Sequence, residues 1–349
     1  MSRETRMTKS SITLGEPSLE CKYGENGYQT PAALYSGGTD DPLALDRFQV
    51  IQGTAPSYNN LCDLDRLLQT STHIAAGFDL NGGEVPLIGV ACKHGNPCGA
   101  SVGDDPVRVA GQALEGDLRA VFGGLVLLSY EVDEPIAETL MTHRMDGGRR
   151  LLDGIIAPGF TEGAMEMLKR KGDKCRLLVN DALGTLNRDS LDSAQRFRYV
   201  RGGFLAQPNY TFIPDMASVE RIGEAGPQQM SDMVLGWAVG STSNSNTVTL
   251  VRGGMLIGNG VGQQDRVGGC KLAVLRARDA GHLTEDAVAY SDSFFPFVDG
   301  PQELAGAGVK AILSTSGSVR DEEVKQYCRE QGITLYLYPD SKGRGFFGH

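Results

Sequence analysis

Residues 85–129, VPLIGVACKHGNPCGASVGDDPVRVAGQALEGDLRAVFGGLVLLS, carry the pattern that decides the fold. The run VPLIGVAC (85–92) is continuously apolar and contains β-branched residues, which is typical of a buried strand. A loop is expected over 93–105, and Asp105 followed by a proline predicts a helix that ends near residue 116. The run GLVLLS (124–129) predicts a second buried strand. A strand, a helix and a strand in succession indicate an α/β fold.

The same alternation continues toward the C-terminus in two blocks of comparable size, which predicts two similar α/β halves, although no repeat is visible in the sequence. The blocks predict a loose N-terminal arm (1–14), a first half (15–180), a smaller connecting region (181–226) and a second half (227–349). The further elements expected are helices over 134–143, 162–171, 231–239 and 264–280, after 299–301 and from a capping box at 318–321 to residue 332, strands over 154–157, 176–179, 287–292, 309–315 and 333–338, and a hairpin over 247–258.

The amino-acid composition excludes several classes of protein. The 349 residues include 33 basic and 43 acidic side chains, a formal net charge of −10, and 40% of them are hydrophobic. This balance excludes a wholly disordered chain, and the excess of acidic residues argues against a nucleic-acid binder that relies on a broad basic face. No apolar run approaches the ~20 residues that span a bilayer, so no membrane contact is expected.

Cysteine and histidine usage points to a reducing compartment and to no metal site. The seven cysteines include no CxxC pair, and the N-terminus lacks the apolar stretch of a secretory signal. Free thiols and a cytoplasmic location are therefore expected. The five histidines are scattered and match no zinc spacing, so no zinc is predicted.

Adjacent Lys93 and His94 follow the first buried strand, where open α/β sheets place ligands. A neighbouring ammonium group disfavours the imidazolium form, so His94 can act as a general base while Lys93 stabilises a developing oxyanion. A solvated polar loop is the alternative. Cys98 suggests a thiol nucleophile less strongly, because cysteine is often simply buried. The segment also lacks the ligands of the zinc-deaminase signature.

Three later segments have a structural and a functional interpretation each. The glycine-rich run 258–266 can present backbone N–H groups to an anion at a helix N-terminus, or it can be only a tight turn. Asn246 by itself is more often a capping residue than a catalytic one. The loop SDSFFPF (291–297) can stack its aromatic rings on a planar ligand or form a small apolar cluster, and Asp299 can cap a helix.

Taken together, these motifs resemble the formyltransferase part of the bifunctional purine-biosynthesis enzymes. The resemblance covers nearly all of the chain from about residue 18. The motifs that carry it are KYGENGYQTPAALY (22–35), KHGNPCG (93–99), FGG (122–124), DGIIAPG (153–159), SNTVTL…IGNGVGQQDR (245–266), SDSFFPF (291–297) and GSVRDEEV (317–324). It implies two cytidine-deaminase-like halves without zinc, with the active site between the halves and across a homodimer interface.

The resemblance also implies roles for individual residues. Those of the catalytic set are Lys93, His94 and Asn246; those of the nucleotide site are Tyr23, Gly123 and Asp153; those that receive the folate pterin are Phe294, Phe297 and Asp299. Four further substrate-site positions depart from the family pattern: Lys22 replaces an arginine, Tyr28 replaces a histidine, and Arg344 and His349 are separated by one extra residue. Lysine cannot make the bidentate contact of arginine.

The implied reaction is transfer of the formyl group of 10-formyltetrahydrofolate to the 5-amino group of the purine precursor AICAR, which gives FAICAR. Two alternatives remain, a related formyltransferase that acts on a different amine and a non-catalytic nucleotide-binding protein on the same fold. Because little chain precedes Lys22, the resemblance implies a stand-alone transformylase without the family's IMP cyclohydrolase domain, and a separate IMP cyclohydrolase is a possible partner.

Overall fold

The computed structural model describes residues 15–348, so the predicted arm (1–14) and His349 lie outside the described residues. The strands are β1 (Pro17–Cys21), β2 (Ala32–Tyr35), β3 (Gln49–Gln52), β4 (Leu87–Lys93), β5 (Asn96–Gly103), β6 (Leu125–Leu128), β7 (Gly154–Ala157), β8 (Arg176–Val179), β9 (Gln195–Val200), β10 (Gly203–Pro208), β11 (Glu220–Ile222), β12 (Val248–Arg252), β13 (Met255–Gly260), β14 (Val288–Ser291), β15 (Ala311–Ser316) and β16 (Thr334–Pro339). The α-helices are α1 (Tyr58–Gly82), α2 (Pro106–Glu115), α3 (Glu134–Thr142), α4 (Glu162–Leu168), α5 (Pro227–Ser241), α6 (Arg266–Asp279), α7 (Asp299–Gly306), α8 (Asp321–Gln331) and α9 (Asp340–Gly343), and short 3-10 helices cover Leu45–Arg47, Asp181–Thr185 and Arg188–Ser190.

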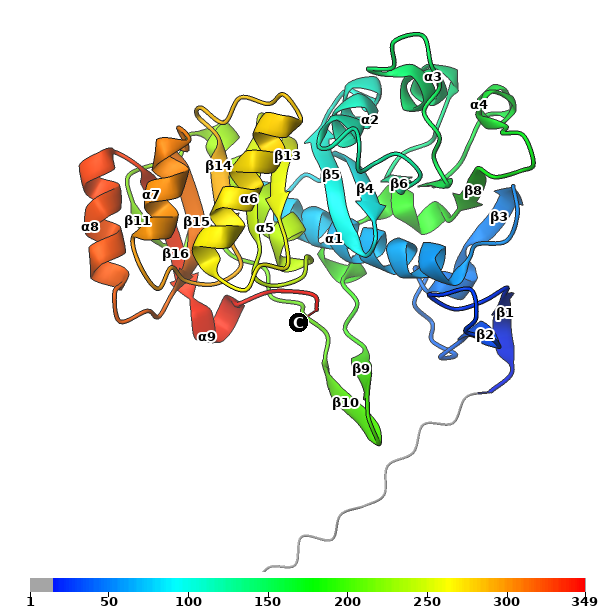
Figure 1. Cartoon of the computed structure of the whole chain (residues 1–349), viewed down its shortest axis with the longest axis horizontal. Coiled ribbons are helices and arrows are strands. Elements are labelled where there is room, and N and C mark those ends of the chain that lie inside the picture. Colours follow the sequence, from blue (N-terminus) through cyan, green and yellow to red (C-terminus); the bar gives the residue numbers. More distant parts are fainter. Residues whose placement is uncertain (1–14, 349) are drawn as a thin grey trace, which may run out of the picture.

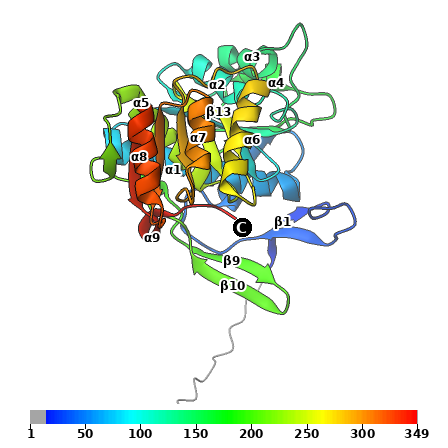
Figure 2. The same cartoon turned by 60° about the vertical axis from the view of Figure 1, so that its left-hand side comes forward.

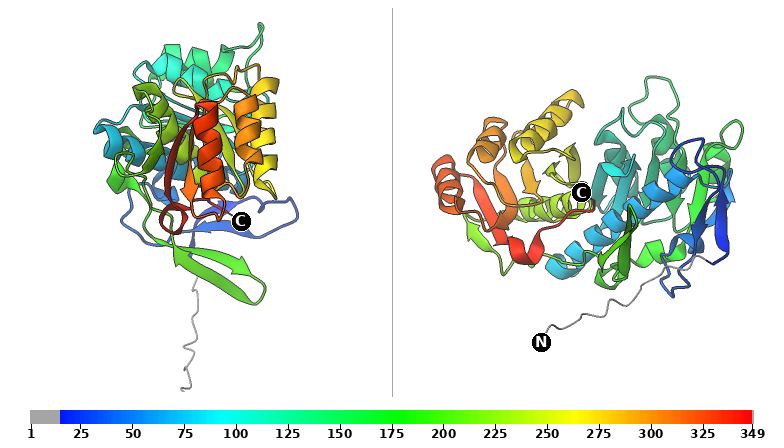
Figure 3. Two further views of the ribbon diagram at one scale, coloured as in Figure 1. Left: turned by 90° about the vertical axis from the view of Figure 1, so that its left-hand side faces the viewer. Right: turned by 60° about the horizontal axis from the view of Figure 1, so that its bottom comes forward.

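Twelve of the described strands form one continuous mixed sheet in the order β11-β16-β15-β14-β12-β13-β5-β4-β6-β7-β8-β3. The pairs β1–β2 and β9–β10 are separate two-stranded antiparallel sheets. Helices lie on both faces of the large sheet (Figures 1 and 3). The predicted α/β class is confirmed as a mixed α/β fold around a large mixed sheet.

The two halves of this sheet repeat one topology. The order β3-α1-β4-β5-α2-β6-α3-β7-α4-β8 recurs as β11-α5-β12-β13-α6-β14-α7-β15-α8-β16. The pairing repeats as well, because β6-β7-β8 and β14-β15-β16 are parallel while the strands that flank them are antiparallel. The equivalent strands β5 and β13 pair antiparallel at the centre. An approximate two-fold axis between β5 and β13 therefore relates the halves.

The repeat extends to the helix caps. At the start of α1, the backbone N–H of Ser57 donates to Asn60 Oδ1 at 3.0 Å. At the start of α5, the backbone N–H of Gly226 donates to Gln229 Oε1 at 3.1 Å. Each bond joins the N-cap residue to an amide side chain three residues later, which is the second half of a capping box. The residue types differ between the two caps, so the repeat is not visible as sequence identity.

The loop expected over 93–105 is wrong, because β5 occupies most of it and pairs along its length with β4. Small residues explain the low strand propensity of β5. A side chain at Gly99 would overlap the carbonyl oxygen of Ala113, and a Cβ at Gly116 would lie 2.7 Å from the Cα of Gly99. Glycine at these positions lets α2 approach the sheet closely.

The predicted capping box at 318–321 forms only in part. Helix α8 begins at Asp321, after an N-cap position occupied by Arg320 that makes no side-chain cap bond. The Asp321 carboxylate accepts the backbone N–H of Ser318 at 3.1 Å, as the box predicts, and also that of Gly317 at 2.7 Å, whereas the Ser318 hydroxyl accepts the N–H of Arg320 at 3.1 Å. A carboxylate in the first turn is favourable at the positive end of the helix dipole.

The apolar core is shared on one face of the sheet and divided on the other. On one face, α1 and α5 pack against each other, and one cluster that spans both halves lies beneath them. On the opposite face, α2, α3 and α4 cover one cluster and α6, α7 and α8 cover another. The seam between α2 and α6 therefore lies between two separate cores. No helix within residues 15–348 has the length and apolarity that crossing a membrane would require.

Substitution of Gly99 tests the close approach of α2. Gly99→Ala should lower the free energy of unfolding by about 3 kcal/mol, because the new methyl group forces the α2 backbone away from the sheet. Gly306→Ala is the matched control, since a Cβ at this helical glycine meets nothing within 4 Å. The control should be neutral or stabilising by up to about 1 kcal/mol. Urea titrations that give both variants the wild-type midpoint would contradict this account of β5.

Candidate active site

A groove of 310 Å³ opens at the seam between the halves, between the ends of α2 and α6. Its walls come from the β4–β5 turn, from β5 and β13 and from α6, and they include Lys93, His94, Asn96, Asn259 and Arg276. This volume is at the lower end of the range of small-molecule sites. The groove carries cationic and amide side chains from both halves, and Asp117, which also lines it, pairs with Arg276 Nη1 at 3.3 Å. This mixture of charged and amide groups suits a polar, hydrogen-bonding ligand.

Lys93 and His94 reach the groove because they end a tight hairpin. Lys93 is the last residue of β4, and His94 with Gly95 forms the two-residue turn into β5. Both turn residues have positive φ, 54° at His94 and 71° at Gly95. Such a turn matches the twist of the strands, but its first position is unusual for a residue with a Cβ.

Strand polarity brings the candidate residues of both halves to one edge of the sheet. The β4–β5 turn lies beside the first residues of β6, β7 and β8. Because β5 and β13 are antiparallel, the same edge carries the end of β13, the start of β12 and the carboxyl ends of β14, β15 and β16. Ligands of open α/β sheets bind outside such carboxyl ends.

Three candidates of the first half, Lys93 among them, lie close together. The Lys93 ammonium donates to the carbonyl oxygen of Phe122 at 2.6 Å, and a Cβ built on Gly123 would lie 4.0 Å from that ammonium. The backbone N–H of Asp153 donates to the carbonyl of Gly124 at 3.0 Å, which ties the start of β7 to the same turn. Lys93, Gly123 and Asp153 therefore form one local cluster.

Asn246 lies just before β12 and is held by an ion pair. Its Oδ1 accepts a hydrogen bond from Arg266 Nη2 at 2.9 Å, and Arg266 Nη1 pairs with the fully buried carboxylate of Asp292. Asp292 also accepts bonds from Ser245 Oγ at 2.8 Å and from the Thr247 N–H at 3.0 Å. Because Oδ1 is engaged, the Asn246 amide can offer its Nδ2 hydrogens to a ligand.

A hydrogen bond across the seam ties the loop before β12, which holds Asn246, to the start of β5, next to Lys93 and His94. The backbone N–H of Asn244 donates to Asn96 Oδ1 at 3.2 Å. The C-terminal segment supports the same loop, because the Phe347 N–H donates to the Ser243 carbonyl at 2.9 Å. In Figure 3 this segment ends at the junction of the halves. Buried Arg66 donates to the Phe347 carbonyl at 2.8 Å and fixes the segment from α1.

The aromatic candidates lie at the same edge, after β14. Phe294 is half-buried, and the Arg344 guanidinium lies 5.7 Å from its ring centroid. Phe297 is exposed, and the Arg320 guanidinium lies 5.0 Å from its ring centroid. The rings are thus separate, and each has a cationic neighbour rather than the other ring.

Two residues next to these rings have structural roles. Phe295 is buried and contacts the position of Gly300, so the apolar-cluster interpretation holds for this member of the loop. Asp299 is exposed and is the first residue of α7 rather than its N-cap, which is Val298. Its Oδ1 accepts the N–H of Gly300 at 2.8 Å.

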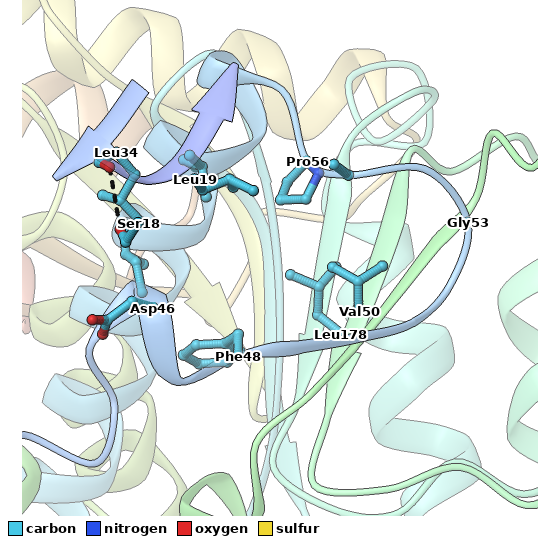
Figure 4. A pocket seen from close by; sticks show the side chains of 12 residues that line it. Ser18, Leu19, Leu34, Asp46, Phe48, Val50, Gly53, Pro56 and Leu178 are labelled. Atoms are coloured by element: carbon cyan, nitrogen blue, oxygen red, sulfur yellow. Dashed lines mark hydrogen bonds between the residues drawn. The ribbon is translucent and has the colours of Figure 1, made fainter. Parts of the chain in front are cut away.

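Lys22, Tyr23 and Tyr28 lie apart from the seam groove. They belong to the exposed connection between β1 and β2, and the described residues that line the groove do not include them. The small β1–β2 sheet covers a second cavity of 510 Å³ instead. Figure 4 shows Leu19, Leu34 and Phe48 around this cavity. His349, the remaining candidate, lies outside the described residues.

Cys98 faces the groove but is held as a thiol. Burial raises the pKa of Cys98 to about 12, and nearby Asp117 acts in the same direction. A thiol with such a pKa is a poor nucleophile near neutrality. Residues 15–348 contain no group of three or more His, Cys, Asp or Glu side chains suited to hold a metal ion.

Four buried residues organise this edge although no local sequence pattern marks them. They are Asp63, Arg66, Arg266 and Asp292. Arg266 and Asp292 occur inside quoted motifs, but their pairing joins α6 to the end of β14 and requires the tertiary fold. Asp63 and Arg66 lie in α1, for which no element was predicted.

Comparison with known proteins agrees with the resemblance. The model of the AICARFT/IMPCHase bienzyme family matches residues 2–276. The chain is 37% identical to the bifunctional purine biosynthesis protein PurH of Anoxybacillus flavithermus over 316 residues. These aligned residues cover 90% of this chain and 57% of that protein. The PurH proteins of Clostridium botulinum and Cutibacterium acnes are each 33% identical, over 91% and 93% of this chain and 57% and 58% of their own lengths.

The chain belongs to the AICARFT/IMPCHase bienzyme family. It spans less than two thirds of the length of these curated relatives.

The raised pKa of the Cys98 thiol gives a chemical prediction. In the native protein at pH 8, Cys98 should resist alkylation by iodoacetamide, because only a minute fraction of a thiol with a pKa of about 12 is ionised. The same residue should be modified rapidly in urea, where burial no longer raises its pKa. Peptide mass spectrometry measures both. Rapid native modification of Cys98 would restore the nucleophile hypothesis.

Proposed function

We propose that this chain transfers the formyl group of 10-formyltetrahydrofolate to the 5-amino group of AICAR, giving FAICAR and tetrahydrofolate. The observation that carries the proposal is the groove at the seam, which Lys93 and His94 line together. Membership of a family whose relatives are named for purine biosynthesis supports the same reaction. Ring closure of FAICAR is a separate reaction, for which an IMP cyclohydrolase is the proposed partner.

The chemistry explains why such a pair is needed. The AICAR amine is conjugated with its imidazole and carboxamide, so it attacks a formyl carbon poorly without a base. As the N–C bond forms, His94 takes a proton from the amine, and the formyl oxygen gains the negative charge. Lys93 and the Asn246 amide stabilise this oxyanion. When the bond to N10 breaks, N10 keeps the electron pair and receives the proton from His94.

The remaining candidates divide between the two substrates. We propose that the nucleotide contacts Lys22, Tyr23, Tyr28, Gly123, Asp153, Arg344 and His349. The pterin is proposed to contact Phe294, Phe297 and Asp299. The exposure of Phe297 and Asp299 supports the second group, since an aromatic face and an ionised acceptor are both accessible to a planar ligand that carries N–H donors.

The two alternative functions predict different assay results. A related formyltransferase would use 10-formyltetrahydrofolate with another amine and leave AICAR unchanged. A non-catalytic nucleotide-binding protein would bind AICAR without turnover. The retention of Lys93, His94 and Asn246 favours catalysis, because binding alone does not need a base together with oxyanion donors.

An ultraviolet assay for tetrahydrofolate formation tests the reaction. The wild-type chain should turn over with AICAR and 10-formyltetrahydrofolate. His94→Ala should lower kcat by roughly 10²–10⁴, the usual contribution of a positioned general base, with little change in AICAR affinity. Lys93→Ala should be comparably harmful. No turnover by the wild-type chain with AICAR would reject the proposed substrate, and near-normal turnover by His94→Ala would reject the base.

A homodimer is part of the proposal, and the β9–β10 hairpin supports it. This hairpin projects away from the body of the molecule (Figure 2). Its strand pairs place Phe197, Tyr199 and Phe204 on one face, where Phe197 is 53% and Tyr199 82% exposed. An isolated two-stranded hairpin is only marginally stable in water, so a covered aromatic face is expected.

The charge of the β9–β10 hairpin supports a second copy of the chain as the partner that covers its aromatic face. Residues 195–208 contain three arginines and no acidic residue, whereas the whole chain has a net charge of −10. The hairpin is thus a basic arm on an acidic molecule, and a second copy offers the complementary surface.

Disruption of the aromatic face tests the dimer. Tyr199→Ser combined with Phe197→Ser should shift the protein from dimer to monomer in sedimentation velocity, because the interface loses its apolar contacts. Leu283→Ser is the matched control, since Leu283 is 64% exposed but lies away from the hairpin. A dimer that survives the double substitution places the interface elsewhere, and a fully active wild-type monomer would reject the dimer.

A further inference from the structure

The repeat in the fold offers a comparison within the molecule. Asp63 lies six residues after the N-cap of α1, and Asp232 lies six residues after the N-cap of α5. Both carboxylates are buried. They therefore occupy equivalent positions in the two halves.

Each carboxylate holds the hairpin turn of its own half. Asp63 Oδ1 accepts the backbone N–H of Gly95 at 2.7 Å. Asp232 accepts the N–H of Gly253 at 2.9 Å and the N–H of Gly254 at 2.7 Å. The β4–β5 turn and the β12–β13 turn are the equivalent turns of the two halves.

The electrostatic balance of the two carboxylates is also alike. Burial raises the pKa of Asp63, and the backbone N–H of Gly95, the thiol of Cys92, and the charge and backbone N–H of His94 act in the opposite direction. Burial likewise raises the pKa of Asp232, and the N–H groups of Gly254 and Gly253 oppose it. A buried carboxylate is costly unless such donors satisfy it, so each aspartate requires its turn to stay in place.

The turns differ in the residue that each must hold. The second half has Gly253 and Gly254, which adopt φ of 62° and 77° without steric cost. The first half has His94 at φ 54°, a left-handed conformation that is unfavourable for a residue with a Cβ. A strained residue persists only where its surroundings hold it, and such residues cluster at functional sites.

We propose that Asp63 is a positioning residue for His94: its carboxylate fastens the strained His94–Gly95 turn and so keeps the imidazole at the groove. Asp63 is not among the described residues that line the groove, and it acts by holding the turn beside His94. The inference rests on the proposed function of His94 as the base. A displacement of a catalytic group by about 1 Å can cost about 10² in rate, which sets the expected size of the effect.

Kinetics with AICAR and 10-formyltetrahydrofolate test the role. Asp63→Ala should lower kcat by about 10², with little change in either KM. Asp63→Asn should recover most of the loss, because its amide oxygen still accepts the Gly95 N–H. Asp232→Ala is the internal control, since it removes the same contact from a turn without a catalytic side chain. It should keep the wild-type kcat while its melting temperature falls as in Asp63→Ala.

A double-mutant cycle separates positioning from general damage. If Asp63 acts through His94, Asp63→Ala should not lower kcat further in a His94→Ala background. A full additional loss in the double variant, or a kcat of Asp63→Ala equal to that of Asp232→Ala, would overturn the inference. If Asp63→Ala does not fold, Asp63→Leu replaces it, because leucine fills the volume and still removes the acceptors.

A readout without turnover separates this inference from the proposed function. The readout is an NMR spectrum of protein labelled at histidine, in which the His94 ring signal is the one that disappears in His94→Ala. That signal should shift in Asp63→Ala and stay unchanged in Asp232→Ala. A wild-type chain that fails to formylate AICAR would reject the proposed function while leaving this test intact. An unshifted His94 signal in Asp63→Ala would reject the positioning role even in an active enzyme.

Discussion

The arrangement of this molecule depends on a short antiparallel contact between β5 and β13. Met255 lies opposite Ser101, and the Val102 N–H donates to the Gly254 carbonyl at 2.9 Å. This contact turns two six-stranded halves into one sheet. It also fixes the relative direction of the two halves. Because the equivalent strands β5 and β13 run antiparallel, the β4–β5 turn of the first half and the carboxyl ends of the parallel strands of the second half lie at the same edge of the sheet. Every cross-seam feature, including the Asn244–Asn96 hydrogen bond, follows from that direction.

Much of the fold could be predicted from the sequence, because most strands are short apolar runs between turn signals. The strand over 154–157 has the predicted bounds, and the helix opened by Asp105 and Pro106 is present as α2. Helix α1 gave no such signal. Its buried stretch includes Thr70, Thr72 and His73, whose polar groups bond to backbone carbonyls or to a neighbouring hydroxyl, so no apolar stripe marks the helix. The strand β5 could not be predicted for a different reason. Close packing of α2 requires glycine at positions where strand propensity favours branched residues.

The candidate site could likewise be predicted only in part. Residues whose chemistry is local, such as adjacent Lys93 and His94, stand out in the sequence because two basic groups beside a buried strand are unusual. Groups that act through distant partners do not. The pairing of Arg266 with Asp292 and the contact of Asp63 with Gly95 both join segments more than twenty residues apart. Such pairs depend on strand order, and strand order is a property of the whole sheet rather than of any motif.

The duplication has a geometric consequence for function. Within the first half, the β4–β5 turn lies beside the amino ends of β6, β7 and β8, so their carboxyl ends are at the opposite edge. A single half therefore cannot bring its hairpin turn to the loops that follow its own parallel strands. Antiparallel joining of two halves supplies those loops from β14, β15 and β16 of the other half. The two turns are nevertheless used differently: the second half has Gly253 and Gly254 at its own turn, at the opposite edge, while the first half carries the strained His94 beside the carboxyl ends of β14, β15 and β16.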